Sequence, residues 1–239
     1  MEILTYSETN PFCGIPQKKI NNAIEDIKNV HLNPKTGKLS ADGATLLEII
    51  HRYANANLPV DYWFLEMDKF EGDQSLVKAY NKCTASIKDS YNKGMSFCFA
   101  GSHGLGKTLT SACILKRAVE TGKYTALYVN LTDIINLMAS SSSVDQEIKS
   151  EARRLLLSVD FLVIDEFDPR FMSTDNATDL FGRLFEPVLR SRIQNQLPTI
   201  LCTNSTEPDS FFNGALKQSF KSLMKKIETV NVLGVDFRK

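Results

Sequence analysis

Residues that build transition-metal sites are few in this sequence. It has three histidines, and its five cysteines stand singly, with no pair in the C-x-x-C spacing that zinc sites use. A zinc site is therefore not expected. Because scattered, unpaired cysteines are typical of a reducing compartment, we expect the protein in the cytoplasm.

An excess of one charge and long apolar runs are also lacking. Lysine plus arginine and aspartate plus glutamate number 28 each, so any contact with DNA must come from a local basic patch. No apolar stretch approaches the length of a membrane span, and the N-terminus lacks the layout of a signal peptide. We therefore expect a globular protein with no membrane partner.

What the sequence does contain is a complete G-x-x-x-x-G-K-[ST] motif at residues 101–108, between a strand-like run and a helical pattern. Its glycines allow successive backbone N–H groups to point at an anion. Lys107 would reach the β- and γ-phosphates of ATP, and the Thr108 hydroxyl would hold Mg²⁺. The residues expected to contact the nucleotide here are Gly101, Ser102, His103, Gly104, Leu105, Gly106, Lys107, Thr108 and Leu109.

A second motif follows the apolar run 161–164, which is typical of a strand buried on both faces of a parallel sheet. Asp165 and Glu166 end this run, at the edge where open α/β sheets bind ligands. Asp165 is predicted to hold Mg²⁺ together with Thr108. Glu166 is predicted to be the base that polarises the water attacking the γ-phosphate.

A third buried-strand pattern, residues 199–203, ends in Asn204. By itself, an asparagine at this place is an ordinary turn or helix cap. Beside the other two motifs, we interpret Asn204 as a side chain that hydrogen-bonds both the γ-phosphate and the attacking water. Glu166, Asn204 and Lys107 thus form the expected catalytic set.

The chain divides near Pro59 into two predicted regions. Residues 1–58 hold two short helical patterns joined by a turn-rich loop, which bury little on their own. We interpret this region as a docking module for a partner, and a helical extension packed on the rest of the chain fits the pattern equally well. In residues 59–239, strand and helix patterns alternate, which predicts one α/β domain with a parallel five-stranded sheet and helices on both faces.

The elements expected in this domain include a helix before the phosphate-binding motif and a series of strands and helices after it. They span residues 74–91, 124–130, 131–139, 146–157 and 229–233, with a long helix ending near residue 194. The strand inserted between the two nucleotide motifs indicates the additional-strand class of P-loop ATPases.

Together the motifs resemble one family. They are residues 101–108, the run 163–166, Arg192 before Pro198, the run 199–204 and the C-terminal run 234–238. This array resembles AAA+ replicative helicase loaders of the DnaC/DnaI type, which share their core with IstB-type transposition ATPases. The resemblance covers roughly residues 54–239, and it implies an AAA+ P-loop NTPase. Only about thirty-five residues follow Asn204, so we expect no full C-terminal lid domain.

The resemblance also implies a function. It is that of an Mg²⁺-dependent ATPase that binds a hexameric replicative helicase and helps to place it on single-stranded DNA. The alternative is an IstB-like ATPase that binds DNA and directs a transposase. A small-molecule or nucleotide kinase and an inactive nucleotide-binding scaffold are further interpretations. A water-activating Glu166 disfavours the kinase, and the intact set of motifs disfavours the scaffold.

Three further roles come from the resemblance. Arg238 is similar to the sensor 2 arginine, which contacts nucleotide within its own subunit. The region after Asn204 offers lysines but no arginine finger, so Arg192 or Lys221 is expected to act on the nucleotide of a neighbouring subunit, in an assembly that ATP promotes.

The third role concerns DNA. The segment that matches the DNA-contacting helices of the family carries Lys149, Arg153 and Arg154 on one helix face. A solvated helix face, balanced by Glu147 and Glu151, is the plainer interpretation of the same triplet.

Overall fold

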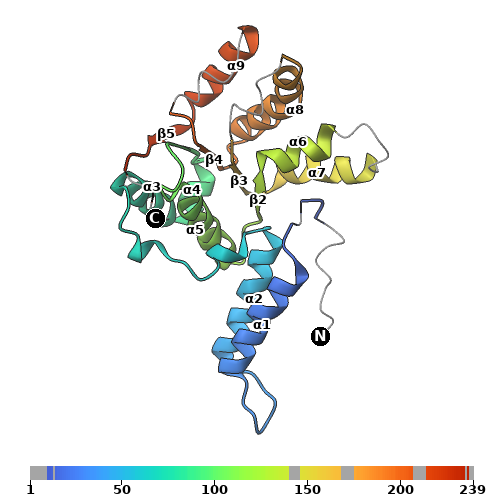
Figure 1. Ribbon diagram of the computed structural model, residues 1–239, viewed down its shortest axis with the longest axis vertical. Coiled ribbons are helices and arrows are strands. Elements are labelled where there is room, and N and C mark those ends of the chain that lie inside the picture. The colour runs from blue at the N-terminus through green and yellow to red at the C-terminus, as the bar shows by residue number, and fades with distance from the viewer. Residues whose placement is uncertain are drawn as a thin grey trace.

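The computed structural model describes residues 10–12, 14–139, 146–167, 175–206, 214–234 and 236. A helical hairpin projects from an α/β body in Figure 1. The hairpin consists of α1 (Gln17–His31) and α2 (Ala41–Asn55). Two short 3-10 helices, Val60–Tyr62 and Met67–Lys69, lie between the hairpin and the body.

The body contains helices and strands in alternation. In chain order they are α3 (Gln74–Thr84), α4 (Ile87–Asn92), β1 (Phe97–Ala100), α5 (Lys107–Glu120), β2 (Ala126–Asn130), α6 (Leu131–Ala139), α7 (Gln146–Ser158), β3 (Phe161–Asp165), α8 (Asp175–Gln194), β4 (Thr199–Thr203), α9 (Gly214–Met224) and β5 (Glu228–Asn231).

The strands form one parallel five-stranded sheet in the order β2-β3-β4-β1-β5. Every residue of β1, β3 and β4 is buried, because helices cover both faces of the sheet. This sheet confirms the predicted fold class. The strand order brings the carboxyl ends of β3, β4 and β1 together at one edge, where the three nucleotide motifs begin.

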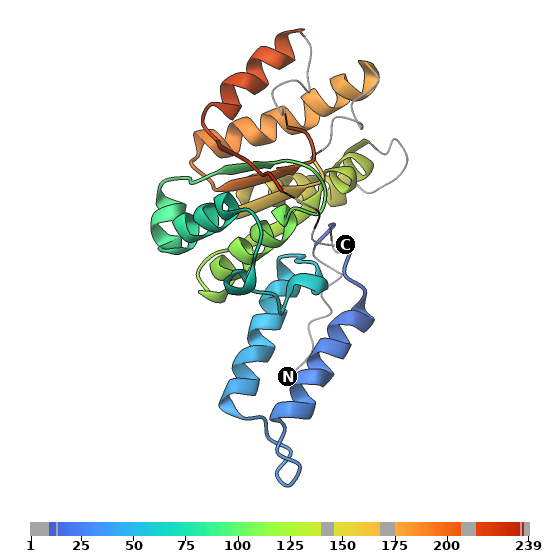
Figure 2. The same cartoon turned by 60° about the vertical axis from the view of Figure 1, so that its left-hand side comes forward.

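Alternate strand residues supply two hydrophobic cores, one on each face of the sheet. Phe97, Phe99 and Val163 pack on the face covered by α3 and α5. Cys98, Leu162 and their neighbours pack on the opposite face, against α6, α7, α8 and α9. Figure 2 shows the sheet nearly edge-on between these two layers.

Some predicted element bounds were wrong. The helix expected over residues 74–91 is two helices, because Ser86 breaks the run and accepts a hydrogen bond from the Asp89 backbone N–H as the cap of α4. The last strand begins at Glu228 and ends at Asn231, earlier than expected.

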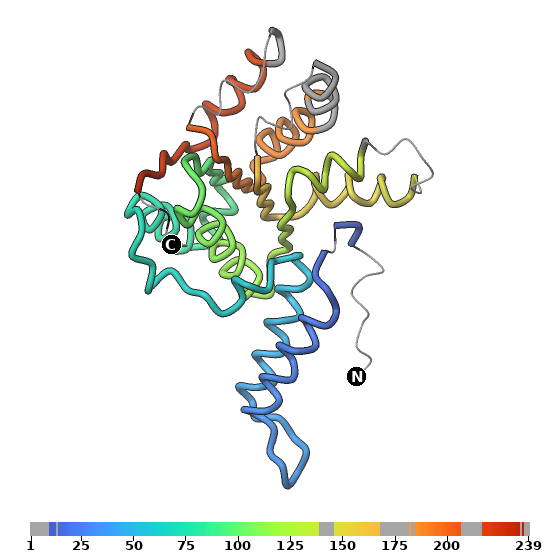
Figure 3. Tube along the Cα trace, viewed as in Figure 1, coloured from blue at the N-terminus to red at the C-terminus, as the bar shows by residue number. Residues whose placement is uncertain are grey.

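The hairpin helices pack on each other and then on the body. Ile20, Ala23 and Ile27 of α1 belong to the same core cluster as Ile50 of α2 and the body residues around β1. The tube in Figure 3 shows that the loop between the two helices is the part of the hairpin farthest from the body. Among the described residues, no helix combines the length and the apolar character needed to cross a bilayer.

The base of the hairpin joins the sheet through backbone and side-chain bonds. The Tyr128 backbone N–H donates to the Ala56 carbonyl at 2.8 Å, and Asn57 Nδ2 donates to the Tyr128 carbonyl at 2.9 Å. Leu58 is fully buried. No break in packing marks the predicted boundary after residue 58, and the division of the chain into 1–58 and 59–239 stays a prediction.

Candidate nucleotide site

The phosphate-binding motif forms a loop between β1 and α5. Gly104 and Gly106 adopt φ values of 73° and 89°, in the left-handed region that favours glycine. A Cβ atom at Gly106 would lie 2.5 Å from the Phe70 ring, and one at Gly104 would lie 1.8 Å from Asp236 Oδ1. The backbone conformation therefore favours glycine at both positions, and any larger residue would also have to displace the Phe70 ring or the Asp236 carboxylate.

Lys107, the first residue of α5, is buried within this loop. Its Nζ donates to the carbonyls of Gly101 and Ser102, at 2.8 and 2.6 Å. These two bonds hold the ammonium group at the N-terminus of α5, where the helix dipole and free N–H groups also favour an anion. The arrangement suits the phosphate-binding role expected of Lys107.

Thr108 and Asp165 meet across the loop and the end of β3. Thr108 Oγ1 donates to Asp165 Oδ2 at 2.8 Å, and the Tyr128 hydroxyl donates to the same carboxylate oxygen at 2.5 Å. Burial and the nearby Asp165 raise the pKa of Tyr128 far above its usual value, so the phenol stays protonated and keeps donating. Sequence reasoning missed Tyr128, although its place near the carboxyl end of β2 puts it at the edge used by Asp165.

Glu166 and Asn204 follow neighbouring strands and line the same cavity. Glu166 is exposed, and its φ of 53° is rare for a residue other than glycine. Its backbone N–H donates to Asp165 Oδ1 at 2.7 Å. Backbone strain of this kind clusters at functional sites, where it aims a side chain in a fixed direction.

The motifs surround one open cavity of about 760 Å³. Its polar floor includes Lys107, Thr108, Asp165, Glu166 and Asn204. The opposite side of the cavity is formed by residues 59–71, a segment that contains no sequence motif and was therefore not predicted to line the site. We call this segment the cavity wall, and the lining residues that it contributes are Pro59, Tyr62, Leu65, Glu66, Lys69, Phe70 and Glu71.

The residues at the floor suit a magnesium ion better than a transition metal. Among the described residues, no group of three or more His, Cys, Asp and Glu side chains could hold a metal by itself. Mg²⁺ needs no such cage, because it binds through one or two protein oxygens together with water and phosphate. The hydroxyl of Thr108 and the carboxylate of Asp165 are oxygens of that kind.

Arg192 was expected to act on a neighbouring subunit, and the structure contradicts this. Its side chain is fully buried in α8, and the guanidinium donates to Thr199 Oγ1 at 2.9 Å. It also donates to backbone carbonyls at the amino edge of the sheet, namely those of Leu156, Val159, Asp160 and Pro198. A buried guanidinium with these partners cannot reach a second nucleotide, so its role is structural.

The other predicted residues lie away from the cavity or outside the described residues. Lys221 is exposed on α9, and Arg238 lies outside the described residues. On α7, Arg153 and Arg154 are exposed and Lys149 is half-buried. Arg154 is ion-paired with Glu151 at 2.5 Å. Their helix ends at the amino edge of the sheet, opposite the nucleotide motifs.

Comparison with known families and structures places this geometry among ATPases. The family described as "ATPase family associated with various cellular activities (AAA)" matches residues 97–226. A comparison with curated proteins finds no match. Solved structures give three informative likenesses.

The first is a crystal structure of DnaI, with a TM-score of 0.57, 16% identity and coverage of 74% of this chain and 93% of that one. The second is the DnaC helicase loader, with a TM-score of 0.55, 17% identity and coverage of 72% and 99%. The third is the replication initiator DnaA bound to AMPPCP and single-stranded DNA, with a TM-score of 0.56, 15% identity and coverage of 74% and 51%. At these identities the likeness shows the fold, and it is the fold of DnaC/DnaI-type AAA+ proteins.

Proposed function

Because the chain belongs to the AAA family of ATPases, we propose that it hydrolyses ATP with Mg²⁺ and uses this cycle to load a replicative helicase onto single-stranded DNA. The observation that carries the ATPase part is the convergence of Lys107, Thr108, Asp165, Glu166 and Asn204 on one cavity. This set provides for phosphate binding, metal binding and activation of water.

Each residue has a separate task in the proposed reaction. Lys107 and the loop N–H groups bind the phosphates, while Thr108 and Asp165 would hold Mg²⁺, which neutralises phosphate charge when bound. Tyr128 fixes the orientation of the Asp165 carboxylate. Glu166 accepts a proton from the attacking water, and the Asn204 side chain orients that water and the γ-phosphate.

The ATPase proposal is tested with Glu166→Gln, which removes the base and keeps the shape of the side chain. Hydrolysis should fall by roughly 10²–10⁴-fold, the usual contribution of general-base catalysis, while ATP affinity is kept. Glu71→Gln is the matched control, because Glu71 lines the same cavity from the wall. Wild-type turnover by Glu166→Gln would refute the assigned role of Glu166.

Two observations support the helicase-loading part of the proposal. The fold is shared with DnaI and with the DnaC helicase loader. A hairpin also projects from the body on the side away from α8 and α9 (Figures 1 and 2). Its loop region exposes Val30 and Leu32 and, between Ile27 and Ala41, contains three lysines and no acidic residue. An exposed apolar and basic tip suits docking to a partner protein.

Co-purification with a replicative helicase tests this part of the proposal. A Val30→Asp, Leu32→Asp variant should lose the helicase and keep its ATPase activity, because both side chains lie far from the cavity. Phe64→Asp is the matched control, since Phe64 is an exposed apolar residue in the segment that joins the hairpin to the body. Capture of a transposase in place of a helicase would favour the alternative function.

A further inference from the structure

Lys116 is a buried cation that takes no part in the proposed reaction. Its side chain is 1% exposed, near the C-terminal end of α5. The ammonium group donates to the Leu65 carbonyl at 2.6 Å and to Glu66 Oε1 at 2.9 Å. It also lies 5.7 Å from the centre of the Tyr53 ring. A buried ammonium is costly unless it is well paired, so this position holds a specific set of partners together.

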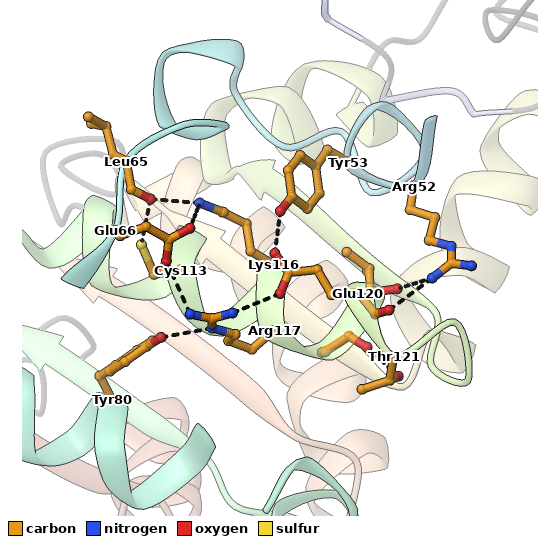
Figure 4. A network of polar contacts seen from close by, with 12 residues as sticks. Arg52, Tyr53, Leu65, Glu66, Tyr80, Cys113, Lys116, Arg117, Glu120 and Thr121 are labelled. Carbon is orange, nitrogen blue, oxygen red and sulfur yellow. Dashed lines mark hydrogen bonds and ion pairs between the residues drawn. The ribbon is translucent and has the colours of Figure 1, made fainter. Parts of the chain in front are cut away.

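The partners of Lys116 come from two different parts of the molecule. Leu65 and Glu66 belong to the cavity wall. Tyr53 belongs to the last turn of α2, at the base of the hairpin. Lys116 therefore contacts the cavity wall on one side and lies beside the hairpin base on the other, and Figure 4 shows Lys116 with Leu65, Glu66 and Tyr53.

The neighbouring residues of α5 strengthen both connections. Arg117 pairs with Glu66 Oε2 at 3.3 Å, so the same carboxylate is held by two cations. The Tyr53 hydroxyl donates to the Glu120 carboxylate, and Arg52 Nη1 donates to the Glu120 carbonyl at 2.9 Å. The last turns of α5 are thus bonded to the wall and to the hairpin base, while its first turn carries Lys107 and Thr108.

The wall and the hairpin base also contact each other directly. Trp63, the only tryptophan in the chain, donates from Nε1 to the Leu58 carbonyl at 2.8 Å. Its ring centroid lies 6.1 Å from that of Tyr53. A displacement of the wall would therefore change contacts at the base of α2 as well as at the end of α5.

We propose that Lys116 is a positioning residue that couples nucleotide binding to the hairpin. A nucleotide in the proposed site would contact the start of α5 through its phosphates and the wall through its remaining surface, and Lys116 joins these two elements to α2. This inference rests on nucleotide binding at the proposed site. By thermodynamic linkage, nucleotide binding then stabilises the hairpin base, and a partner that orders the hairpin strengthens nucleotide binding.

Hydrogen exchange of the full chain, with and without a non-hydrolysable ATP analogue, tests this coupling. In the wild type, nucleotide should slow exchange in α2 by about fivefold, the lower end of ordinary allosteric coupling. In Lys116→Met, the phosphate loop should still be protected by nucleotide, but the effect on α2 should disappear. A merely structural lysine would change α2 equally with and without nucleotide.

Two further variants serve as control and substitute. Lys82→Met removes an exposed lysine that pairs with Glu228 away from the cavity, and it should leave the nucleotide effect on α2 intact. If Lys116→Met does not fold, Glu66→Gln is the substitute. It weakens the Lys116–Glu66 pair at a side chain that is 40% exposed and should be easier to replace.

The outcomes separate this inference from the proposed function. Protection of the phosphate loop without any effect on α2 in the wild type, or the same effect in wild type and variant, would overturn the coupling and leave the ATPase intact. No nucleotide protection anywhere would instead overturn nucleotide binding itself. Trp63 fluorescence gives a second measurement of the same junction.

Discussion

At the scale of single residues, Arg192 shows how burial decides the role of a charged side chain. Burial lowers its pKa to about 9, which still leaves the guanidinium charged at neutral pH. The cation is retained in the core because backbone carbonyls at the end of α7 and just before β3 and β4 accept its hydrogen bonds. Its contribution is to stability, and its effect on a neighbouring subunit is excluded by its position.

Arg192→Met should therefore destabilise the protein without removing any group that contacts nucleotide. Buried carbonyls without a donor cost about 1–3 kcal/mol each, so a loss of roughly 3 kcal/mol or more is expected. For a chain of this size, that lowers Tm by about 6–12 °C. Calorimetry measures this. Arg190→Met on the same helix removes a side chain that is 43% exposed and pairs with Glu186, and it should cost less than Arg192→Met.

Tyr128 gives a second prediction at this scale. Its hydroxyl orients the carboxylate expected to hold Mg²⁺, and loss of such a supporting bond commonly costs about 10–100-fold in metal affinity or activity. Tyr128→Phe should raise the Mg²⁺ concentration that half-saturates ATP hydrolysis by roughly tenfold. Tyr124→Phe, at the other end of the same strand segment, should not. An unchanged Mg²⁺ requirement in Tyr128→Phe would separate Tyr128 from the metal site.

At the scale of elements, α7 carries the proposed contact with single-stranded DNA. Its basic residues are not equivalent: Arg153 and Arg154 are both exposed, but the guanidinium of Arg154 is already paired with Glu151. Arg153 is thus the better placed of the two for a phosphate. A measurement of DNA affinity against salt concentration separates the two interpretations of the triplet, DNA contact and solvated face.

Charge reversal of Lys149, Arg153 and Arg154 should weaken binding to single-stranded DNA and keep ATP affinity. The slope of log affinity against log salt should fall by about 0.7 for each DNA phosphate that the variant no longer neutralises. Lys123→Glu, at an exposed turn residue after α5, is the control. A slope equal to that of the wild type would show that these residues of α7 do not contact DNA and form a solvated helix face.

At the scale of the whole molecule, the open cavity is consistent with the proposed assembly of several copies of the chain. Among the described residues, the wall and the loop line the cavity, and Glu166 at its edge is exposed. A second copy of the chain is a natural cover for the γ-phosphate, so ATP is expected to promote self-association. Lys221 stays the candidate that contacts the neighbouring nucleotide.

Sedimentation in the presence of a non-hydrolysable ATP analogue should show a larger species than without nucleotide. Mixing Glu166→Gln with Lys221→Ala then tests action in trans, because some interfaces would combine a wild-type base with a wild-type lysine. Activity should partly return in the mixture. No recovery at any ratio, in a mixture shown to co-assemble, would contradict the role of Lys221.

The sequence alone determined the phosphate loop, the Asp-Glu and Asn strand ends and the alternation of strands with helices. Each of these features depends on residues close together in the sequence, so their spacing and periodicity are enough to predict it. Membership of the AAA family and the parallel five-stranded sheet agree with those predictions.

Only the tertiary structure decided what lies next to these motifs. Tyr128 and the cavity wall reach the site from segments without a motif, and Lys116 bonds to that wall. The burial of Arg192 follows from the packing of α8 against the starts of β3 and β4. Contacts between residues far apart in the chain depend on strand order and on side-chain packing. Local pattern does not record these contacts, because two residues far apart in the chain can pack together without leaving any mark on each other's neighbours in sequence.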